Sequence, residues 1–319
     1  MARQYLVGVD IGGTNLKVGL VTPAGEVKAY TTRPTRLDGG WAGVVDQVEE
    51  LVAALLQQQG LSLTAVGGLG VGVPGTVRLP QGEVLFAPNL KWENVPLLAT
   101  LSTRLPVPVR LDNDAHVAAL GEYWRGAGQG YGSVLLLTLG TGIGTAFLWR
   151  GRVFRGRAGL GSEMGHMVID PAGPLCGCGN RGCLEALAAA PALERLAHRL
   201  LAAGLSSRLT CAGNWGVGEV FAAAAAGDEV GQKVVEEMVG HLAVGLANAV
   251  VLIDPEVIIL GGGISGSADL FLPALSEEVA RRVGRMAYPP PTIVPAALGN
   301  LAGILGAAYL VRGELGEDE

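Results

Sequence analysis

Short apolar runs at the start of the chain predict three consecutive strands. Tyr5–Val9 and Leu16–Val21 are rich in β-branched and aliphatic residues, and Gly12 and Gly13 mark a turn between them. A third strand is expected near Val27–Tyr30, after a turn that contains Pro and Gly. The pattern therefore predicts a β-meander.

Beyond this meander the apolar residues recur at helical spacing. Ala42–Gln59 carries them three and four positions apart and is followed by a glycine, which predicts a helix. Buried strands are expected at Ala65–Val73 and Val107–Leu111. The polar residues 112–114 then provide a cap for a helix over Ala115–Arg125.

A second strand, glycine turn and strand follow and resemble the first. Ser133–Leu139 leads into the turn Gly140-Thr141-Gly142, and strands are expected at Thr145–Trp149 and from Val153. Overlaid on the start of the chain, Gly140 falls on Gly12 and Thr138 on Asp10, an offset of about 128 residues. The sequence thus predicts two related α/β lobes that face a central cleft.

The lobe boundary is expected between residues 115 and 116. The N-terminal lobe would span 1–115, with a C-terminal helix at 300–319 packing back on it, and the second lobe would span 116–299. The remaining patterns predict helices at Leu184–Ala203, at Asp228–Leu252, around Arg281 and at Ala302–Val311, and strands at Val257–Leu260 and Thr292–Val294.

Composition narrows the class of protein. The 319 residues are 49% hydrophobic and 16% charged, which excludes general disorder, and the net charge of −6 makes nucleic acid a poor partner. The 50 glycines are expected in turns, close helix packing and ligand loops. The N-terminus does not resemble a signal peptide, and the apolar stretch Leu242–Ile253 is too short to span a bilayer. A cytoplasmic protein is expected, without a membrane partner.

The first chemical motif is the turn Asp10-Ile-Gly-Gly-Thr-Asn-Leu-Lys17. Its Gly12 and Gly13, the Thr14 hydroxyl and the Lys17 side chain can approach a phosphate. A carboxylate does not bind phosphate directly, so Asp10 is best explained as a holder of Mg²⁺ or its waters. An ordinary hairpin turn remains the alternative.

Two further glycine turns fit the same chemistry. Gly140-Thr141-Gly142 occupies the corresponding place in the second half, and Gly261-Gly262-Gly263 follows a buried strand and precedes a predicted helix. Close packing of strand and helix is the alternative for the latter. The G-x-G-x-x-G match ending at Gly75 does not open a helix, so we reject a dinucleotide site there. The chain contains no P-loop sequence and no protein-kinase motif set.

Asn113-Asp114 lies where a strand meets a helix. Asp114 can serve as a helix cap, or as a general base that accepts the proton of a sugar hydroxyl attacking a γ-phosphate.

A cluster of soft ligands follows the second meander. His166, Cys176, Cys178 and Cys183 form the Cys₃His set that closes a tetrahedral structural zinc site, and the intervening glycines allow tight wrapping. A loop of reduced thiols is the alternative. Cys211 stands apart and is expected to be an inert thiol.

In combination these motifs resemble the ROK family of sugar kinases and sugar-responsive repressors. The segments that carry the resemblance, over nearly the whole chain, are Asp10-Ile-Gly-Gly-Thr14, Gly72-Val-Pro-Gly75, Pro88-Asn-Leu90 with Trp92, Asn113-Asp-Ala115, Leu139-Gly-Thr-Gly142, Glu163-x-Gly-His166, Cys176-x-Cys-Gly-x-x-Gly-Cys183-Leu-Glu185 and Leu260-Gly-Gly-Gly263.

The resemblance implies an actin/hexokinase-like (ribonuclease H-like) α/β fold and transfer of phosphate from ATP, with Mg²⁺, to a hexose. Glucose, phosphorylated at its 6-hydroxyl, is the expected substrate, with fructose or N-acetylmannosamine as alternatives. Asp114 resembles the family's catalytic base. The hydroxyl-binding positions implied by the resemblance are Asn89, Asn113, Glu163, His166 and Glu185, with the backbone of Gly75. A homodimer or higher homo-oligomer is also implied.

Two positions depart from the family pattern. His116 stands where Asn is common, and Gly161-Ser162 replaces Ala-Gly; neither is expected to carry chemistry, although both can affect the choice of sugar. A repressor of the same family needs a DNA-binding helix-turn-helix, and nine residues before Asp10 leave no room for one. A catalytically inactive sugar-binding protein is disfavoured because Asp114 and the glycine turns are present.

Overall fold

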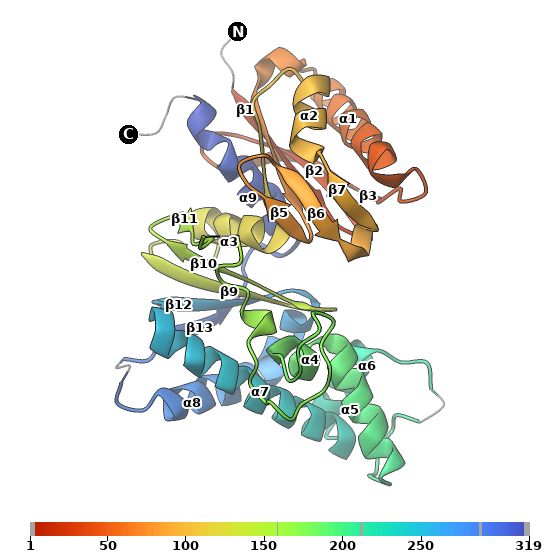
Figure 1. Cartoon of the computed structure of the whole chain (residues 1–319), viewed down its shortest axis with the longest axis vertical. Helices are drawn as coiled ribbons and strands as arrows, with labels where there is room; N and C mark the ends of the chain where they lie inside the picture. Colours follow the sequence, from red (N-terminus) through yellow and green to blue (C-terminus); the bar gives the residue numbers. More distant parts are fainter. Residues whose placement is uncertain (1–3, 158, 211–212, 287–288, 316–319) are drawn as a thin grey trace. The chain divides into compact units, whose positions relative to one another are not determined.

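The computed structural model describes residues 4–157, 159–210, 213–286 and 289–315, and it divides into two compact units (Figure 1). Unit 1 combines Met1–Gly132, Phe147–Gly161 and Ala297–Glu319, and unit 2 combines Ser133–Ala146 and Ser162–Ala296. The expected boundary at residue 115 differs from this division, in which the helix that follows residue 113 belongs to unit 1. Cys211 lies outside the described residues.

The main sheet of unit 1 begins with the predicted meander and has the strand order β3-β2-β1-β4-β8. β1 pairs with β2, and β2 with β3, in antiparallel fashion, whereas β4 is parallel to both β1 and β8. Its strands are β1 (Tyr5–Ile11), β2 (Asn15–Val21), β3 (Val27–Pro34), β4 (Val66–Val73) and β8 (Val109–Asn113). The parallel strands β4 and β8 place their carboxyl ends at one edge, next to the carboxyl end of β1.

A small antiparallel sheet of unit 1 was not predicted from the apolar pattern. Its strands, in the order β5-β6-β7, are β5 (Thr76–Arg78), β6 (Glu83–Ala87) and β7 (Trp92–Val95). The helices of this unit are α1 (Gly40–Gln58), α2 (Leu97–Arg104), α3 (Asp114–Arg125) and α9 (Ala302–Leu310). α2 was not predicted, because its eight residues are too few to show a clear helical spacing of apolar positions.

α9 lies so close to the main sheet of unit 1 that glycine is required on β1 and on β4. A Cβ atom on Gly8 of β1 would lie 2.0 Å from the carbonyl oxygen of Ile304, and one on Gly70 of β4 would lie 1.7 Å from that of Ala307. These distances are far below van der Waals contact. Close helix packing, one of the roles expected for the many glycines, is therefore confirmed.

The second five-stranded sheet repeats the connectivity of the first. Its order is β11-β10-β9-β12-β13, with β12 parallel to β9 and β13, so each strand has a counterpart in the first sheet. Its strands are β9 (Ser133–Leu139), β10 (Ile143–Trp149), β11 (Arg152–Val153), β12 (Val257–Gly261) and β13 (Thr292–Pro295). The predicted duplication of an α/β arrangement is confirmed.

The α-helices in the described part of unit 2 range from five to 25 residues in length. They are α4 (Leu184–Ala188), α5 (Ala190–Ala202), α6 (Val217–Ala225), α7 (Glu229–Ile253) and α8 (Leu272–Val283). The single helix predicted over Leu184–Ala203 is interrupted at Ala189, whose extended backbone precedes Pro191. Short 3-10 helices cover Leu63–Ala65, Pro88–Leu90, Met164–His166, Gly263–Leu270, Gly299–Leu301 and Arg312–Leu315.

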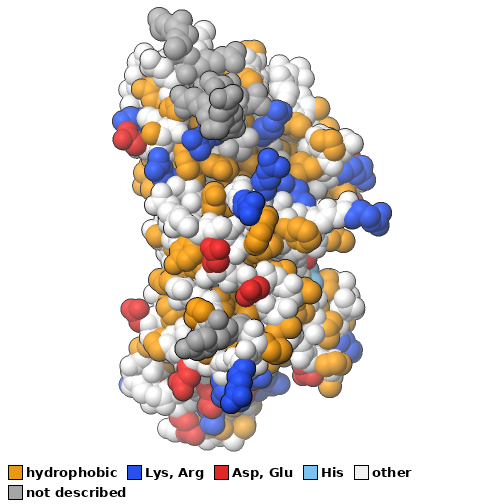
Figure 2. All heavy atoms as spheres, turned by 90° about the vertical axis from the view of Figure 1, so that its left-hand side faces the viewer, with side chains coloured by type: hydrophobic (Ala, Val, Ile, Leu, Met, Phe, Trp, Pro, Cys, Tyr) orange, Lys and Arg blue, Asp and Glu red, His pale blue; other side chains and the backbone are white. Residues whose placement is uncertain are grey.

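α7 is long and apolar enough to cross a bilayer by length and composition, unlike the shorter stretch considered from sequence. However, 56% of its apolar 18-residue stretch is buried inside the protein, as is common for a core helix. Buried side chains such as Val234, Met238, Leu242 and Leu246 recur along one face of α7 at helical spacing. Figure 2 shows basic, acidic and hydrophobic side chains interspersed on one face of the protein.

Candidate functional site

The glycine turn after β1 is held by its own backbone. The N–H of Gly12 donates to the carbonyl oxygen of Asn15 at 2.9 Å, and the hydroxyl of Thr35 donates to the carbonyl oxygen of Gly12 at 2.6 Å. The Gly12 N–H is therefore already occupied, whereas the Thr14 side chain is exposed and available to a ligand. A Cβ on Gly13 would lie 3.1 Å from the carbonyl oxygen of Asn89, so two predicted site residues are neighbours.

Asp10 and Lys17 face each other across β1 and β2. They are register partners in the antiparallel pair, and Lys17 Nζ donates to Asp10 Oδ2 at 2.9 Å. The two side chains are 18% and 21% exposed, respectively, so the ion pair is partly screened by solvent. A carboxylate and an ammonium group thus lie together at the carboxyl end of β1.

Gly303 in the first turn of α9 approaches the same carboxylate. A Cβ atom at this position would lie 2.6 Å from both Cγ and Oδ2 of Asp10. Only glycine therefore fits here without displacing Asp10. No local pattern could have indicated this role, because Gly303 and Asp10 are almost the whole chain apart.

Asn113 and Asp114 lie at the junction of β8 and α3, as predicted. Asn113 Oδ1 accepts from the backbone N–H groups of Ala115 at 2.8 Å and His116 at 3.3 Å, which caps the helix. Its Nδ2 donates to the carbonyl oxygen of Gly75 at 3.0 Å. The cap is thus Asn113, and the Asp114 side chain stands in the first turn.

The Asp114 carboxyl has an unusual acidity. Desolvation by burial, followed by the negative charge of Asp10, raises its pKa from 3.8 to about 6, against the opposing effect of the Ala115 N–H donated to Oδ1 at 2.9 Å. A carboxyl group with a pKa near 6 is a better proton acceptor than an ordinary aspartate and is still ionised at neutral pH. The arrangement can therefore serve general-base chemistry.

Sequence reasoning missed the partners of Asp112, the buried residue just before this pair. The Arg155 guanidinium donates to Asp112 Oδ2, and His116 lies at Asp112 Oδ1. A helical spacing of four could have suggested the His116 contact. No local pattern could have suggested the contact with Arg155, which is 43 positions away.

In unit 2 the structure brings a predicted sugar-binding residue against a predicted phosphate turn. Glu185 stands in the first turn of α4, and its Oε2 accepts from the N–H of Ile143 at 3.0 Å. A Cβ on Gly142 would lie 2.6 Å from the same oxygen. The turn is also tied to the start of α5, because the N–H of Ala190 donates to the carbonyl oxygen of Gly140 at 2.8 Å. Thr141 lies between these two tied glycines and is exposed.

The third glycine turn, Gly261–Gly263, follows β12 as predicted but enters a 3-10 helix, Gly263–Leu270, before α8 begins. Gly262 has φ +84°, and a Cβ there would lie 2.4 Å from the carbonyl oxygen of Leu139. Glycine is thus needed at the middle position both for its backbone conformation and for close approach to β9. Gly263 has open space around its Cα.

Glu163 and His166 flank the short helix Met164–His166 of unit 2. Glu163 stands before its first residue, and the Thr145 hydroxyl holds both neighbours of Glu163: it donates to the carbonyl oxygen of Ser162 and accepts from the Met164 N–H at 2.9 Å. The backbone on either side of Glu163 is thereby anchored to β10. The Glu163 side chain itself is exposed and available to a ligand.

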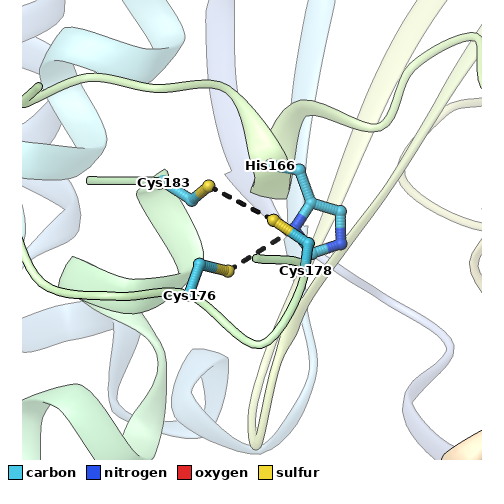
Figure 3. A group of neighbouring side chains, drawn as sticks. All are labelled: His166, Cys176, Cys178 and Cys183. Atoms are coloured by element: carbon cyan, nitrogen blue, oxygen red, sulfur yellow. Dashed lines mark hydrogen bonds between the residues drawn. The ribbon is translucent and has the colours of Figure 1, made fainter. Parts of the chain in front are cut away.

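The four predicted metal ligands converge, as Figure 3 shows. Their ligand atoms all lie within 4.8 Å of one another. Cys176 Sγ is 3.7 Å from His166 Nδ1, and Cys178 Sγ is 3.6 Å from Cys183 Sγ. Zinc bonds of about 2.3 Å to sulfur in a tetrahedron require ligand separations of about 3.8 Å. The donor set and its spacing therefore fit a zinc ion.

The backbone around this cluster explains the spacing of its ligands. The N–H of Cys176 donates to the carbonyl oxygen of Asn180 at 2.7 Å, and Val168 forms an isolated β-bridge with Cys183. Gly182 has φ +69°, and a Cβ there would lie 1.5 Å from the carbonyl oxygen of Asp170. The chain can therefore close on itself only with glycine at that position.

The cysteines differ in acidity because their surroundings differ. Burial raises the pKa of the Cys183 thiol to about 12 and also raises the pKa of the Cys176 thiol. Backbone donation by Asn180 lowers the pKa of the exposed Cys178 thiol. Zinc binds thiolates, so a bound ion has to supply the charge that lets the two buried thiols ionise.

Known proteins resemble this chain over nearly its full length. The ROK family profile matches residues 6–314. A glucokinase of Thermotoga maritima is 35% identical over 321 aligned residues, covering 99% of this chain and 100% of that protein. The crystal structure of a ROK family glucokinase from Streptomyces griseus, in complex with glucose and AMPPNP, is 35% identical with a TM-score of 0.81, covering 97% of this chain and 99% of that one.

A regulator is also similar in structure. A ROK family transcriptional regulator, a homologue of the E. coli MLC protein, has a TM-score of 0.87 at 27% identity, and the match covers 98% of this chain and 78% of the regulator. The family profile, the glucokinase relatives and the duplicated α/β fold agree along nearly the whole sequence. This chain belongs to the ROK family.

Proposed function

We propose that this protein transfers the γ-phosphoryl group of ATP to the 6-hydroxyl group of glucose. The observation that carries the proposal is the Asp114 carboxyl group, whose pKa is raised to about 6 at the start of α3, in a chain 35% identical to a glucokinase over its full length. A base with this pKa accepts the hydroxyl proton as the sugar oxygen attacks phosphorus. Asp114 is the catalytic base in this proposal.

The hexose hydroxyl groups are bound by a mixture of acceptors and amides. Glu163 and Glu185 accept hydrogen bonds, and Asn89 can both donate and accept, which suits a polyol. Asn113 uses its Oδ1 to cap α3 and one Nδ2 hydrogen for Gly75, so one amide hydrogen remains for the sugar. The remaining members of this set in the proposal are His166 and the backbone of Gly75.

The phosphate groups are bound by the three glycine turns. Thr14 in unit 1 and Thr141 in unit 2 are exposed, and Gly263 in unit 2 has open space around its Cα, so all three have room for a ligand. The wider proposed phosphate- and nucleotide-binding set is Asp10, Gly12, Gly13, Thr14, Lys17, Gly140, Thr141, Gly142, Gly261, Gly262 and Gly263. Asp10 would hold Mg²⁺ or its water ligands, and the ion would neutralise charge on the transferred group.

A structural zinc ion completes the proposal. His166, Cys176, Cys178 and Cys183 supply four ligands and so leave no position open for chemistry. The ion would instead fix the backbone of the segment that contains Glu163 and the start of α4 with Glu185. Cys176 Sγ lies 3.8 Å from Glu185 Oε1, which places that carboxylate directly beside the ligand cluster.

We propose a cytoplasmic location for the enzyme, because ATP and reduced thiol ligands are both found in the cytoplasm. A homodimer or higher homo-oligomer is proposed from the family resemblance, and light scattering coupled to size-exclusion chromatography tests it.

A sugar-sensing role is the second candidate function, supported by the structural similarity to a transcriptional regulator.

A coupled-enzyme assay with ATP and Mg²⁺ tests the proposal. We expect turnover with glucose above that with fructose, mannose or N-acetylmannosamine. Asp114→Asn keeps the size of the side chain but removes its basicity, so kcat should fall by roughly 10²-fold or more while glucose affinity changes only a few-fold. The exposed Asp38→Asn is the matched control and should leave kcat unchanged. Sugar-dependent DNA binding with no turnover on any hexose would favour the sensing role.

A further inference from the structure

The buried carboxylate of Asp112 has no part in the proposed reaction, yet it directly precedes Asn113 and Asp114. Its side chain is 2% exposed. Oδ1 accepts from His116 Nδ1 at 2.8 Å and from the backbone N–H of Asn113 at 2.8 Å. Oδ2 accepts from the guanidinium group of Arg155. Both carboxylate oxygens are therefore occupied by donors of the protein.

The partners of Asp112 keep it charged inside the protein. Burial alone would raise the pKa of Asp112, but the hydrogen bond from His116, and then the charges of His116 and Arg155, hold it below its usual range. Loss of either partner leaves a buried negative charge that is only partly compensated, which costs more than an exposed ion pair would gain. The geometry of the network is thus strongly specified.

This network fixes the direction in which the proposed base points. Asp112 binds the N–H at the end of β8 and a ring in the first turn of α3, so it sets the angle between the strand and the helix. Asn113 adds the helix cap and the hydrogen bond to Gly75. Asp114 stands between these anchored positions, and a displacement of about 1 Å can reduce a reaction rate by 10²-fold.

Arg155 is the long-range member of the network. It follows β11, and apart from the contact to Asp112 its guanidinium group reaches the carbonyl oxygen of Val153 at 3.4 Å, a weak contact. Its buried Nε has no hydrogen-bond partner in the described part of the chain. The ion pair with Asp112 is therefore the main interaction that holds the Arg155 side chain in place.

We propose that Arg155 is a positioning residue that acts through the buried Asp112 carboxylate to orient Asn113 and Asp114 for phosphoryl transfer. The inference rests on the proposed kinase function. A charged, planar guanidinium on Asp112 Oδ2, opposite His116 on Oδ1, holds the strand end from two sides.

A double-mutant cycle tests the inference. Arg155→Met should lower kcat at saturating glucose and ATP by roughly 10- to 100-fold, and Arg155→Lys, which keeps the charge, should lose less. Glucose affinity, measured by calorimetry, should fall because Asn113 is displaced, whereas affinity for an ATP analogue should change little. Because Arg155 acts through Asp112, the losses of Arg155→Met and Asp112→Asn should not add in the double variant.

Arg157→Met is the matched control, because it removes the same charge from an exposed position two residues along the same segment. All rates are normalised to the concentration of folded enzyme and measured well below the thermal unfolding midpoint. A variant that only loses stability then keeps the wild-type kcat. An Arg155→Met variant with kcat within twofold of the wild type, or additive losses in the double variant, overturns the inference and leaves the kinase function standing. Absence of hexose phosphorylation by the wild type overturns both.

Discussion

Lys17 Nζ donates to Asp10 Oδ2 at 2.9 Å, directly across the first two strands. Asp10 is in turn one of the groups that raise the pKa of Asp114 to about 6. The three side chains are therefore electrostatically coupled in unit 1. The Lys17 ammonium group partly neutralises the Asp10 carboxylate, and the Asp10 charge in turn raises the pKa of Asp114. In a kinase, bound Mg²⁺ and phosphate would add charges near these three side chains and alter the electrostatic environment of each.

Lys17→Met should shift the acid limb of the kcat/KM profile to higher pH. Without the ammonium group, the negative charge of Asp10 is less compensated, and that charge raises the pKa of Asp114. KM for ATP should also rise by roughly tenfold, because a cation near the phosphate groups is lost. A pH profile of kcat/KM measures both effects. Lys28→Met, at an exposed surface pair, is the control, and an unshifted acid limb in Lys17→Met would contradict the coupling.

Asp114→Asn should raise the thermal unfolding midpoint at about pH 8, although it removes activity. The pKa of Asp114 is about 6 in the folded protein, against an ordinary value of 3.8. A carboxyl group whose pKa rises on folding contributes its stability below the ordinary value and loses that contribution as the pH rises through about 6. The negative charge of the Asp114 carboxylate therefore destabilises the folded wild type at pH 8. The asparagine amide of the variant has no charge and so avoids this cost.

Scanning calorimetry at two pH values checks this expectation. At about pH 3 both side chains are neutral, so the difference between the midpoints of Asp114→Asn and the wild type should disappear. The exposed Asp38→Asn should show no such pH-dependent gain. A midpoint of Asp114→Asn that is lower than that of the wild type at pH 8 would count against the raised pKa.

Cys178→Ser should reduce hexose affinity by roughly tenfold or more, with a much smaller effect on nucleotide affinity. The cluster adjoins the segments that carry Glu163 and Glu185. Glu185 contacts one of the three glycine turns, Gly140–Gly142, and the turns after β1 and β12 are held by separate backbone contacts. Elemental analysis should first give about one zinc ion per wild-type chain. Calorimetry with glucose and with an ATP analogue then separates the two affinities.

Cys211→Ser is the control for this experiment, because it makes the same substitution at the one cysteine that the predicted Cys₃His set leaves out. Wild-type protein that contains no zinc when purified without a chelator, or a zinc-free variant with normal hexose affinity, would refute the structural zinc.

Gly70→Ala should lower the free energy of unfolding by roughly 1–3 kcal/mol, because α9 has to move away from β4. The new Cβ would lie 1.7 Å from the backbone oxygen of Ala307, and backbone cannot turn aside as a side chain can. Gly240→Ala in α7 is the matched control: it has open space around its Cα and should gain up to about 1 kcal/mol from helix propensity. Denaturant unfolding of both variants measures the difference, and equal midpoints would contradict the packing argument.

Local patterns determined most of the elements and the metal cluster. β1, α1, α7 and β12 lie within a few residues of their predicted bounds, because each is long or strongly apolar enough to show its period. The three cysteines and His166 could be recognised because ligands of one ion lie close together in sequence as well as in space. The short, partly polar strands β5 and β7 gave no such period and were missed.

Contacts between distant parts of the chain were decided only by the tertiary structure. The sequence indicated Asp114 as a candidate base, but its acidity depends on burial and on Asp10, more than one hundred positions away. The need for glycine at position 303 and the bond from Arg155 to Asp112 likewise exist only once separate segments meet. Such contacts depend on how segments pack in three dimensions, and the periodicity of a single segment carries no information about which partner it meets.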